Sequence, residues 1–137
     1  ACHRMRDAYI AVMVEAGFSN GRVKVSRLVA VVDCGKPVNP DIARQQIEGG
    51  MIFGLAMALG GSPSYRNSLP VKMRLADYGL PRLADVGDVM VEFQESSGGP
   101  ISVSEIGVPP VAPALASALS TITGKRYRSL PIMGRAA

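Results

Sequence analysis

The residue best suited to chemistry in this chain is Glu105, which stands in the stretch ISVSEIGVPP, residues 101–110. Apolar residues and two prolines flank it, and a carboxylate placed among apolar groups becomes a better proton acceptor near neutral pH. Prolines stiffen a loop, and glycine lets backbone amides approach a ligand closely. These features make Glu105 a candidate general base, although a glutamate in a loop is more often simply solvated.

Other reactive residue types are scarce. His3 is the only histidine of the chain and stands near one end, so no histidine-based triad or zinc site is expected. The two cysteines, Cys2 and Cys34, have no metal-like spacing, and Cys34 is expected to be a small packed residue. Phosphate-binding glycine loops and nucleophile elbows are absent. We therefore expect no metal ligands and treat His3 as an exposed terminal residue.

Two strands are expected ahead of these residues. Residues 9–18 read YIAVMVEAGF, and residues 23–32 read VKVSRLVAVV, which alternates at first and is then fully apolar. Between them lies Ser19-Asn20-Gly21, and Asn-Gly tolerates the positive φ of a tight turn. The pattern predicts a β-hairpin.

A helix is expected over residues 42–59, with Asp41 capping its free amides. Its apolar residues recur every four positions, as Ile47, Met51, Leu55 and Leu59. Gly49, Gly50 and Gly54 lie inside it, at a cost of about 1 kcal/mol each relative to alanine. We expect another backbone, or a ligand, to approach the helix there.

The remainder predicts a shorter set of elements. Residues 60–70 and much of 77–88 are rich in loop-forming residues, and residues 89–94 suggest a short strand. An alanine-rich helix is expected over 111–122, with Pro113 in its first turn and Gly124 ending it, followed by an extended segment over 127–132. Together these elements predict an α+β fold, with a mixed sheet, a hairpin and helices on one face.

Composition narrows the class of protein. The chain has 137 residues, of which 47% are hydrophobic and 19% charged, so it is long enough for one domain, over residues 1–137. The net charge of +4 comes from scattered basic residues without stacking aromatics, which argues against nucleic-acid binding. No apolar run is long enough for a membrane span. Localisation stays open between cytoplasm and periplasm.

Three stretches carry a resemblance to a known family. They are SEIGVPPVAPALASALSTITGKRYRSLPI (104–132), VVDCGKPVNPDIARQQIEGGMIFGLAMAL (31–59) and LADYGLPRLADVGDVMVEFQES (75–96). Each resembles a segment of the molybdenum-binding large subunit of the xanthine dehydrogenase and aldehyde oxidoreductase family, and they occur in the family's order. Among its members, those of isoquinoline oxidoreductase and aldehyde dehydrogenase type are most similar. The resemblance implies the C-terminal, molybdenum-cofactor-binding portion of a larger subunit, with the fold of that family's molybdopterin-binding domain.

The resemblance also implies a function. Glu105 matches the family's catalytic glutamate, a base in the oxidation of an aldehyde or N-heterocycle with water-derived oxygen. Gln46, Ser104, Ile106 and Gly107 match positions beside a molybdenum-pterin cofactor, either molybdopterin or its cytosine dinucleotide. The dithiolene of that cofactor holds the metal, so no protein ligands are needed. Implied partners are the remaining large-subunit segments and an iron–sulfur subunit or other electron acceptor, and the chain alone is expected to be inactive.

Two departures keep alternatives open. Ser104 stands where the family has glycine, and its side chain could crowd the cofactor or alter the φ of the loop. The family's large subunit is also several times longer than this chain. A non-catalytic cofactor-binding or assembly domain that kept the fold is therefore the alternative reading, and an unrelated α+β module is a third. Substrate identity, electron acceptor and oligomeric state are not readable from the sequence.

Overall fold

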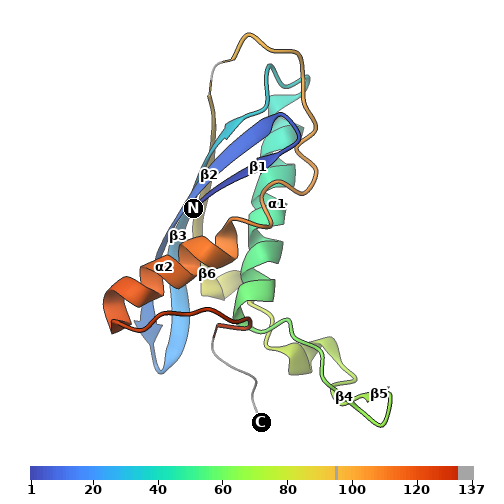
Figure 1. Cartoon of the computed structure of the whole chain (residues 1–137), viewed down its shortest axis with the longest axis vertical. Helices are drawn as coiled ribbons and strands as arrows, with labels where there is room; N and C mark the ends of the chain where they lie inside the picture. Colours follow the sequence, from blue (N-terminus) through green and yellow to red (C-terminus); the bar gives the residue numbers. More distant parts are fainter. Residues whose placement is uncertain (95, 133–137) are drawn as a thin grey trace.

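The computed structural model describes residues 1–94 and 96–132. Its centre is a four-stranded sheet in the order β1-β2-β3-β6, with two α-helices packed against one face (Figure 1). A two-stranded hairpin, β4-β5, lies apart from this sheet. The expected α+β fold with a mixed sheet and helices on one face is confirmed.

The hairpin of β2 (Ala8–Ser19) and β3 (Arg22–Asp33) forms where the sequence predicts it. Its turn places Asn20 at φ 51° and Gly21 at φ 73°, the conformation that Asn-Gly favours in tight hairpins. Burial alternates along β2 as far as Val14, as expected for a strand with one covered face. A bulge between Glu15 and Ala16 shifts the register near the turn.

One outer strand was not predicted, and the other is longer than predicted. β1 (Cys2–Met5) pairs antiparallel with β2, so His3 is a half-buried strand residue and not a loose terminal one. β6 (Val86–Phe93) begins three residues before the predicted strand and pairs parallel to β3. The parallel pairing explains the long connection between β3 and β6, because parallel neighbours require a crossover.

Helix α1 (Pro40–Leu59) runs alongside the strands and packs against β6 and α2 (Figure 1). Asn39, and not Asp41 as predicted, caps it, since its side-chain oxygen accepts a hydrogen bond of 3.1 Å from the Ile42 amide. Pro40 then takes the first helical position, which suits its fixed φ, and Asp41 lies in the first turn. Of the predicted apolar stripe, three residues are fully buried and Leu59 is half-buried.

Helix α2 (Val111–Thr123) packs on β2 and on α1. Pro113 lies in its first turn, and Gly124 ends it at φ 68°, as predicted. The following residues form no strand, and bends and a turn at 129–132 interrupt the extended segment predicted over 127–132. Instead the chain returns to α1, where the Ile132 amide donates a hydrogen bond of 2.8 Å to the Ala58 carbonyl.

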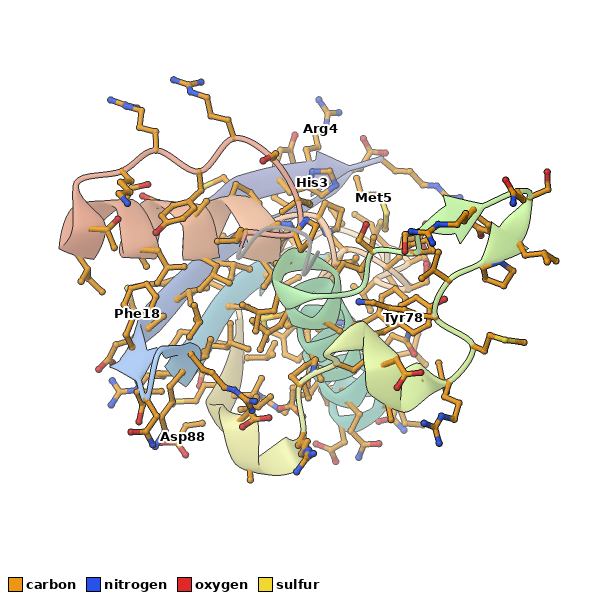
Figure 2. All side chains as sticks on the ribbon, turned by 90° about the horizontal axis from the view of Figure 1, so that it is seen from below. His3, Arg4, Met5, Phe18, Tyr78 and Asp88 are labelled. Atoms are coloured by element: carbon orange, nitrogen blue, oxygen red, sulfur yellow. The ribbon has the colours of Figure 1, made fainter. Side chains whose placement is uncertain are left out.

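The segment between α1 and β6 forms a projecting arm (Figure 1). It contains β4 (Tyr65–Arg66), β5 (Leu69–Pro70) and the 3-10 helices η1 (Leu75–Tyr78) and η2 (Leu83–Asp85), where loops were predicted. The Tyr78 hydroxyl donates a 3.0 Å hydrogen bond to the Lys72 carbonyl (Figure 2). Leu69, Met73 and Leu75 are exposed along the arm.

The core lies between the sheet and the two helices. Its fully buried large side chains come from both layers, and from the loop before α2, as Ile10, Leu28, Ile47, Met51, Leu55, Ile106, Leu115 and Leu119. Among the described residues, none that is polar or charged is buried. The opposite face of the sheet has no such cover, and Met13, Val31 and Met90 remain exposed there. Nowhere in 1–94 and 96–132 does a helix reach the length and hydropathy that a bilayer crossing requires.

Candidate functional site

The site is built where the loop of residues 101–110 presses on α1. A Cβ added to Gly107 would lie 2.6 Å from the Ile47 carbonyl oxygen, and one added to Gly54 would lie 2.5 Å from the Val108 carbonyl oxygen. A Cβ added to Gly50 would lie 3.4 Å from the Gly107 Cα, which is an ordinary van der Waals contact. The close backbone approach predicted from the helix glycines is therefore confirmed at Gly50 and Gly54. Gly49 faces open space, and nothing in the structure explains it.

This packing brings three of the predicted site residues together. The Gln46 side-chain amide on α1 donates a hydrogen bond of 2.8 Å to the backbone carbonyl of Ser104. The Ser104 hydroxyl in turn donates to Oε2 of Glu105. The Val108 amide donates to the Glu105 carbonyl at 3.0 Å, which closes a turn around the glutamate. Residues 58 positions apart in sequence thus meet at the surface.

Glu105 differs from the expected setting, because its side chain is exposed and not enclosed by its apolar sequence neighbours. Ile106 is 0% exposed because its side chain enters the core. Val103 and Val108 are only partly buried. The apolar residues beside Glu105 therefore fasten the loop and leave the carboxylate open to solvent.

The other two predicted cofactor residues have a packing role in this chain. Ile106 is 0% exposed, and Gly107 is buried against the α1 backbone. Their contact with a cofactor stays a prediction. Both residues set the distance between the loop and α1, and so determine where the side chains of Ser104 and Glu105 lie on the surface.

The serine before Glu105 does not strain the loop. Positive φ among non-glycine residues occurs at Arg6, Asn20, Asn67 and Ser68 and not at Ser104. Ser104 therefore avoids the left-handed region that disfavours side chains, and whether its φ differs from that of a glycine at this position stays a prediction. The side chain of Ser104 is exposed beside Glu105, so it occupies space at the site itself.

Other reactive groups lie elsewhere. Cys34 is a packed core residue, 1% exposed, as predicted. Burial, with the nearby Asp33 carboxylate, raises the pKa of its thiol above the ordinary value of 9.0, which makes it a poor nucleophile. Across the described residues, no group of three or more His, Cys, Asp or Glu side chains is placed to hold a metal ion.

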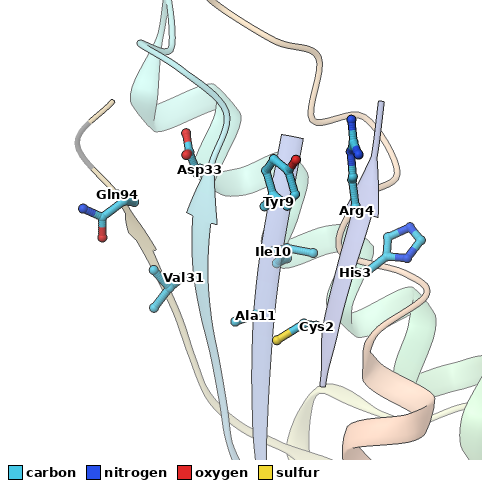
Figure 3. Close-up of a pocket in the computed structure, with 9 residues that line it drawn as sticks. All are labelled: Cys2, His3, Arg4, Tyr9, Ile10, Ala11, Val31, Asp33 and Gln94. Atoms are coloured by element: carbon cyan, nitrogen blue, oxygen red, sulfur yellow. The ribbon is translucent and has the colours of Figure 1, made fainter. Parts of the chain in front are cut away.

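Two shallow hollows also lie away from Glu105. One, of about 510 Å³, opens on the uncovered face of the sheet, where Tyr9 of β2 and Arg4 of β1 lie side by side, with the guanidinium 5.4 Å from the ring centre (Figure 3). The other, of about 530 Å³, lies beside Lys36, Phe93 and Ser96. Neither was predicted, although the alternation in β2 already places Tyr9 and Ala11 on the outer face.

Comparison with known proteins agrees with this fold. A family model described as a molybdopterin cofactor-binding domain matches residues 5–87, a range that contains Gln46 but not Ser104 or Glu105. The β subunit of isoquinoline 1-oxidoreductase from Brevundimonas diminuta is 33% identical over 128 residues, covering 92% of this chain and 16% of the relative. The aldehyde oxidoreductase molybdenum-binding subunit of Escherichia coli K12 is 35% identical, covering 87% and 18%.

Solved structures show the same architecture. Quinoline 2-oxidoreductase from Pseudomonas putida 86 superposes with a TM-score of 0.76 at 26% identity, over 91% of this chain and 17% of that chain. A Cu,Mo-containing CO dehydrogenase superposes with a TM-score of 0.78 at 20% identity and shows the same fold. This chain spans 16% to 18% of the length of the two curated relatives described above. The chain belongs to the molybdopterin cofactor-binding domain family of the molybdenum hydroxylases.

Proposed function

We propose that this chain forms one wall of the molybdenum-pterin site of a molybdenum hydroxylase, with Glu105 as general base in the oxidation of an aldehyde or N-heterocycle. The observation that carries the proposal is the hydrogen bond of 2.8 Å from Gln46 to the Ser104 carbonyl, which fixes the loop bearing Glu105 on α1. An exposed carboxylate on a well-held loop suits proton transfer, because a base must be positioned before its proton affinity matters.

The residues present fit such a cofactor in chemical type. Gln46 offers an amide oxygen that takes part in no hydrogen bond within the described residues, and a pterin carries ring N–H groups that could donate to it. The exposed surface of Gln46, Ser104 and Glu105 provides one polar side of a site, and other segments would have to provide the rest. When bound, the cofactor supplies the metal and the two-electron chemistry, whether as molybdopterin or as its cytosine dinucleotide.

The role of the chain's own residues follows from their placement. Glu105 accepts a proton from the water-derived nucleophile at its carboxylate, while Gln46 and the buried Ile106 keep the loop in place. Gly107 lets the loop lie directly on the helix backbone, since a side chain there would collide with Ile47. The chain thus orients the base.

A hybrid subunit tests this proposal. In the E. coli aldehyde oxidoreductase molybdenum-binding subunit, this chain would replace the matching segment, beside the partner subunits that the resemblance implies, including one with iron–sulfur clusters. Molybdenum content and aldehyde oxidation with an artificial electron acceptor would be measured. Glu105→Gln should keep the molybdenum and reduce turnover roughly 100-fold or more, the usual contribution of a general base.

Glu15→Gln is the matched control, because Glu15 lies near the β2–β3 turn in a surface ion pair with Arg27 at 3.9 Å. It should leave turnover unchanged. If Glu105→Gln turns over like its parent, Glu105 is not the base. If no molybdenum binds to the hybrid, the cofactor assignment fails as well.

The alternative is that the chain serves in assembly, and the uncovered face of the sheet favours a contact with other segments of the subunit. Met13 pairs with Val29, and Val29 with Met90, so these side chains form one row across β2, β3 and β6. Met13 is 63% and Met90 48% exposed. Exposed apolar patches mark interaction sites, and the curated relatives contain several times more chain than this one. We infer that this row packs against remaining segments of the large subunit.

Co-purification tests that inference. Met13→Gln with Met90→Gln should lower capture of this chain by a separately expressed remainder of the relative's subunit roughly tenfold, as expected for loss of about 1.4 kcal/mol at an interface. Lys24→Gln, at an exposed position near the turn, is the control and should not change capture. Equal capture of all variants would place the interface elsewhere. A hybrid that binds molybdenum but never turns over, with or without Glu105, would favour the non-catalytic alternative.

A further inference from the structure

Ser104 takes part in two hydrogen bonds, one through its backbone and one through its side chain. Its backbone carbonyl accepts the hydrogen bond of 2.8 Å from Gln46, and its hydroxyl donates to Oε2 of Glu105. The resemblance described for the sequence implies a glycine at this position, and glycine has no hydroxyl to donate. On that resemblance, the hydroxyl contact to Glu105 depends on the serine of this chain.

The backbone on both sides of Glu105 is already held. Ile106 is 0% exposed, and the Val108 amide donates to the Glu105 carbonyl at 3.0 Å. Gly107 packs closely on the α1 backbone, since an added Cβ would lie 2.6 Å from the Ile47 carbonyl oxygen. The remaining freedom of Glu105 is the rotation of its own exposed side chain, and the Ser104 hydroxyl acts on that freedom.

We propose that Ser104 is a positioning residue whose hydroxyl holds the Glu105 carboxylate by Oε2 and leaves Oε1 open to accept a proton. Within the described part of the chain, Oε1 takes part in no hydrogen bond. A carboxylate has about four acceptor positions on two oxygens, so one donor can orient it without using up its basic capacity. Holding a reacting group in one orientation removes the need to find that orientation during the reaction.

The proposal rests on the proposed function only where it says that the orientation serves proton transfer. The orientation itself is a property of the isolated chain, and it is measurable without cofactor or turnover. Three variants separate the possible causes. Ser104→Ala removes the hydroxyl and keeps Cβ, Ser104→Gly restores the family pattern, and Ser104→Thr keeps a hydroxyl at the same position.

The measurement is the χ1 rotamer population of Glu105, from three-bond couplings to its Cγ in the isotope-labelled chain at neutral pH. We expect one dominant rotamer in the parent and in Ser104→Thr, and two or more comparably populated rotamers in Ser104→Ala and Ser104→Gly. Couplings of Glu15, on the far hairpin, serve as the internal reference and should not change. An unchanged amide spectrum of the core residues shows that each variant is folded.

Rotamer averaging in the parent, or a single rotamer that survives in Ser104→Ala, would overturn the proposal. So would averaging in Ser104→Thr. The outcome of the hybrid-subunit experiment does not depend on the outcome of the rotamer measurement. If the rotamer is held but Glu105→Gln leaves turnover unchanged, Ser104 orients a carboxylate that is not the base, and the proposed function fails while the positioning stands.

Discussion

The two faces of the central sheet are made by the same strands but have different surroundings. On the inner face, Leu28 of β3 is 0% exposed beneath the helices. On the outer face, Met13 of the neighbouring strand is 63% exposed. Both side chains are large and apolar, so hydropathy alone does not separate them. Within the described residues, the helices cover the inner face, whereas the outer face carries exposed apolar side chains such as Met13 beside charged ones such as Arg27.

Truncation of one side chain on each face gives the largest expected effect. Leu28→Ala should lower the free energy of unfolding by about 2–5 kcal/mol, because it leaves a cavity in a packed core. Met13→Ala should cost less than about 1 kcal/mol, because its side chain is already largely in water. Urea unfolding of the two variants measures both. Similar losses at both positions would mean that the outer face is also covered in solution.

The contact between α1 and the loop of residues 101–110, which we call the close seam, is expected to give the next largest effect on the free energy of unfolding. Gly54→Ala should destabilise the chain by about 1–3 kcal/mol, since the new Cβ would lie 2.5 Å from the Val108 carbonyl oxygen. Gly49→Ala, five residues earlier on the same helix, has no neighbour within 4 Å. It should stabilise the chain by about 0.5–1 kcal/mol through helix propensity. Thermal unfolding compares the pair, and equal effects would contradict the close seam.

A smaller effect is expected at the start of α1, the helix that covers the inner face. Asn39→Ala should cost about 1 kcal/mol, because it removes the acceptor of the 3.1 Å hydrogen bond from Ile42. Asp41→Ala should cost roughly 0.3–0.5 kcal/mol, through its interaction with the helix dipole alone. Chemical denaturation distinguishes the two. A larger loss at Asp41 would restore it as the cap.

The smallest expected effect concerns the pH dependence on the inner side. Because the pKa of the Cys34 thiol is raised in the folded chain, the folded state keeps its proton where the unfolded state loses it. Stability from this source is complete below about pH 9 and falls as the pH rises above it. Cys34→Ala should remove this part of the fall in the free energy of unfolding between pH 8 and 10, as measured by urea unfolding across that range.

In the native chain, the exposed Cys2 should react with a thiol reagent well before the buried Cys34.

Much of the fold was predictable because its signals are local. The hairpin follows from alternating residues around Asn20-Gly21, and the end of α2 follows from Gly124. β1 was missed because its four residues, CHRM, alternate only weakly and depend on pairing with β2. The prediction of Asp41 as the cap overlooked a signal in the sequence, because proline favours the first helical position and Pro40 therefore indicates Asn39 as the cap.

The site was only partly predictable, for a related reason. Resemblance pointed to Gln46, Ser104 and Glu105, and the structure brings these three together. Sequence neighbours suggested an apolar setting for Glu105, yet Ile106 turns its side chain into the core and leaves Glu105 in solvent. Neighbours along a loop point in different directions, so their hydropathy does not describe the surroundings of one side chain. The Ser104 hydroxyl contact depends on that same geometry.

The parallel pairing of β6 with β3 has a consequence for the order in which the chain folds. The β2–β3 hairpin needs only its own turn, whereas Val25 meets Val86 only after the whole intervening crossover has been gathered in. The loop bearing Glu105 lies further along the chain than β6. We therefore expect Gln46 to be in place on α1 while Glu105 is still unattached, so that Glu105 reaches its final position in one of the last steps of folding.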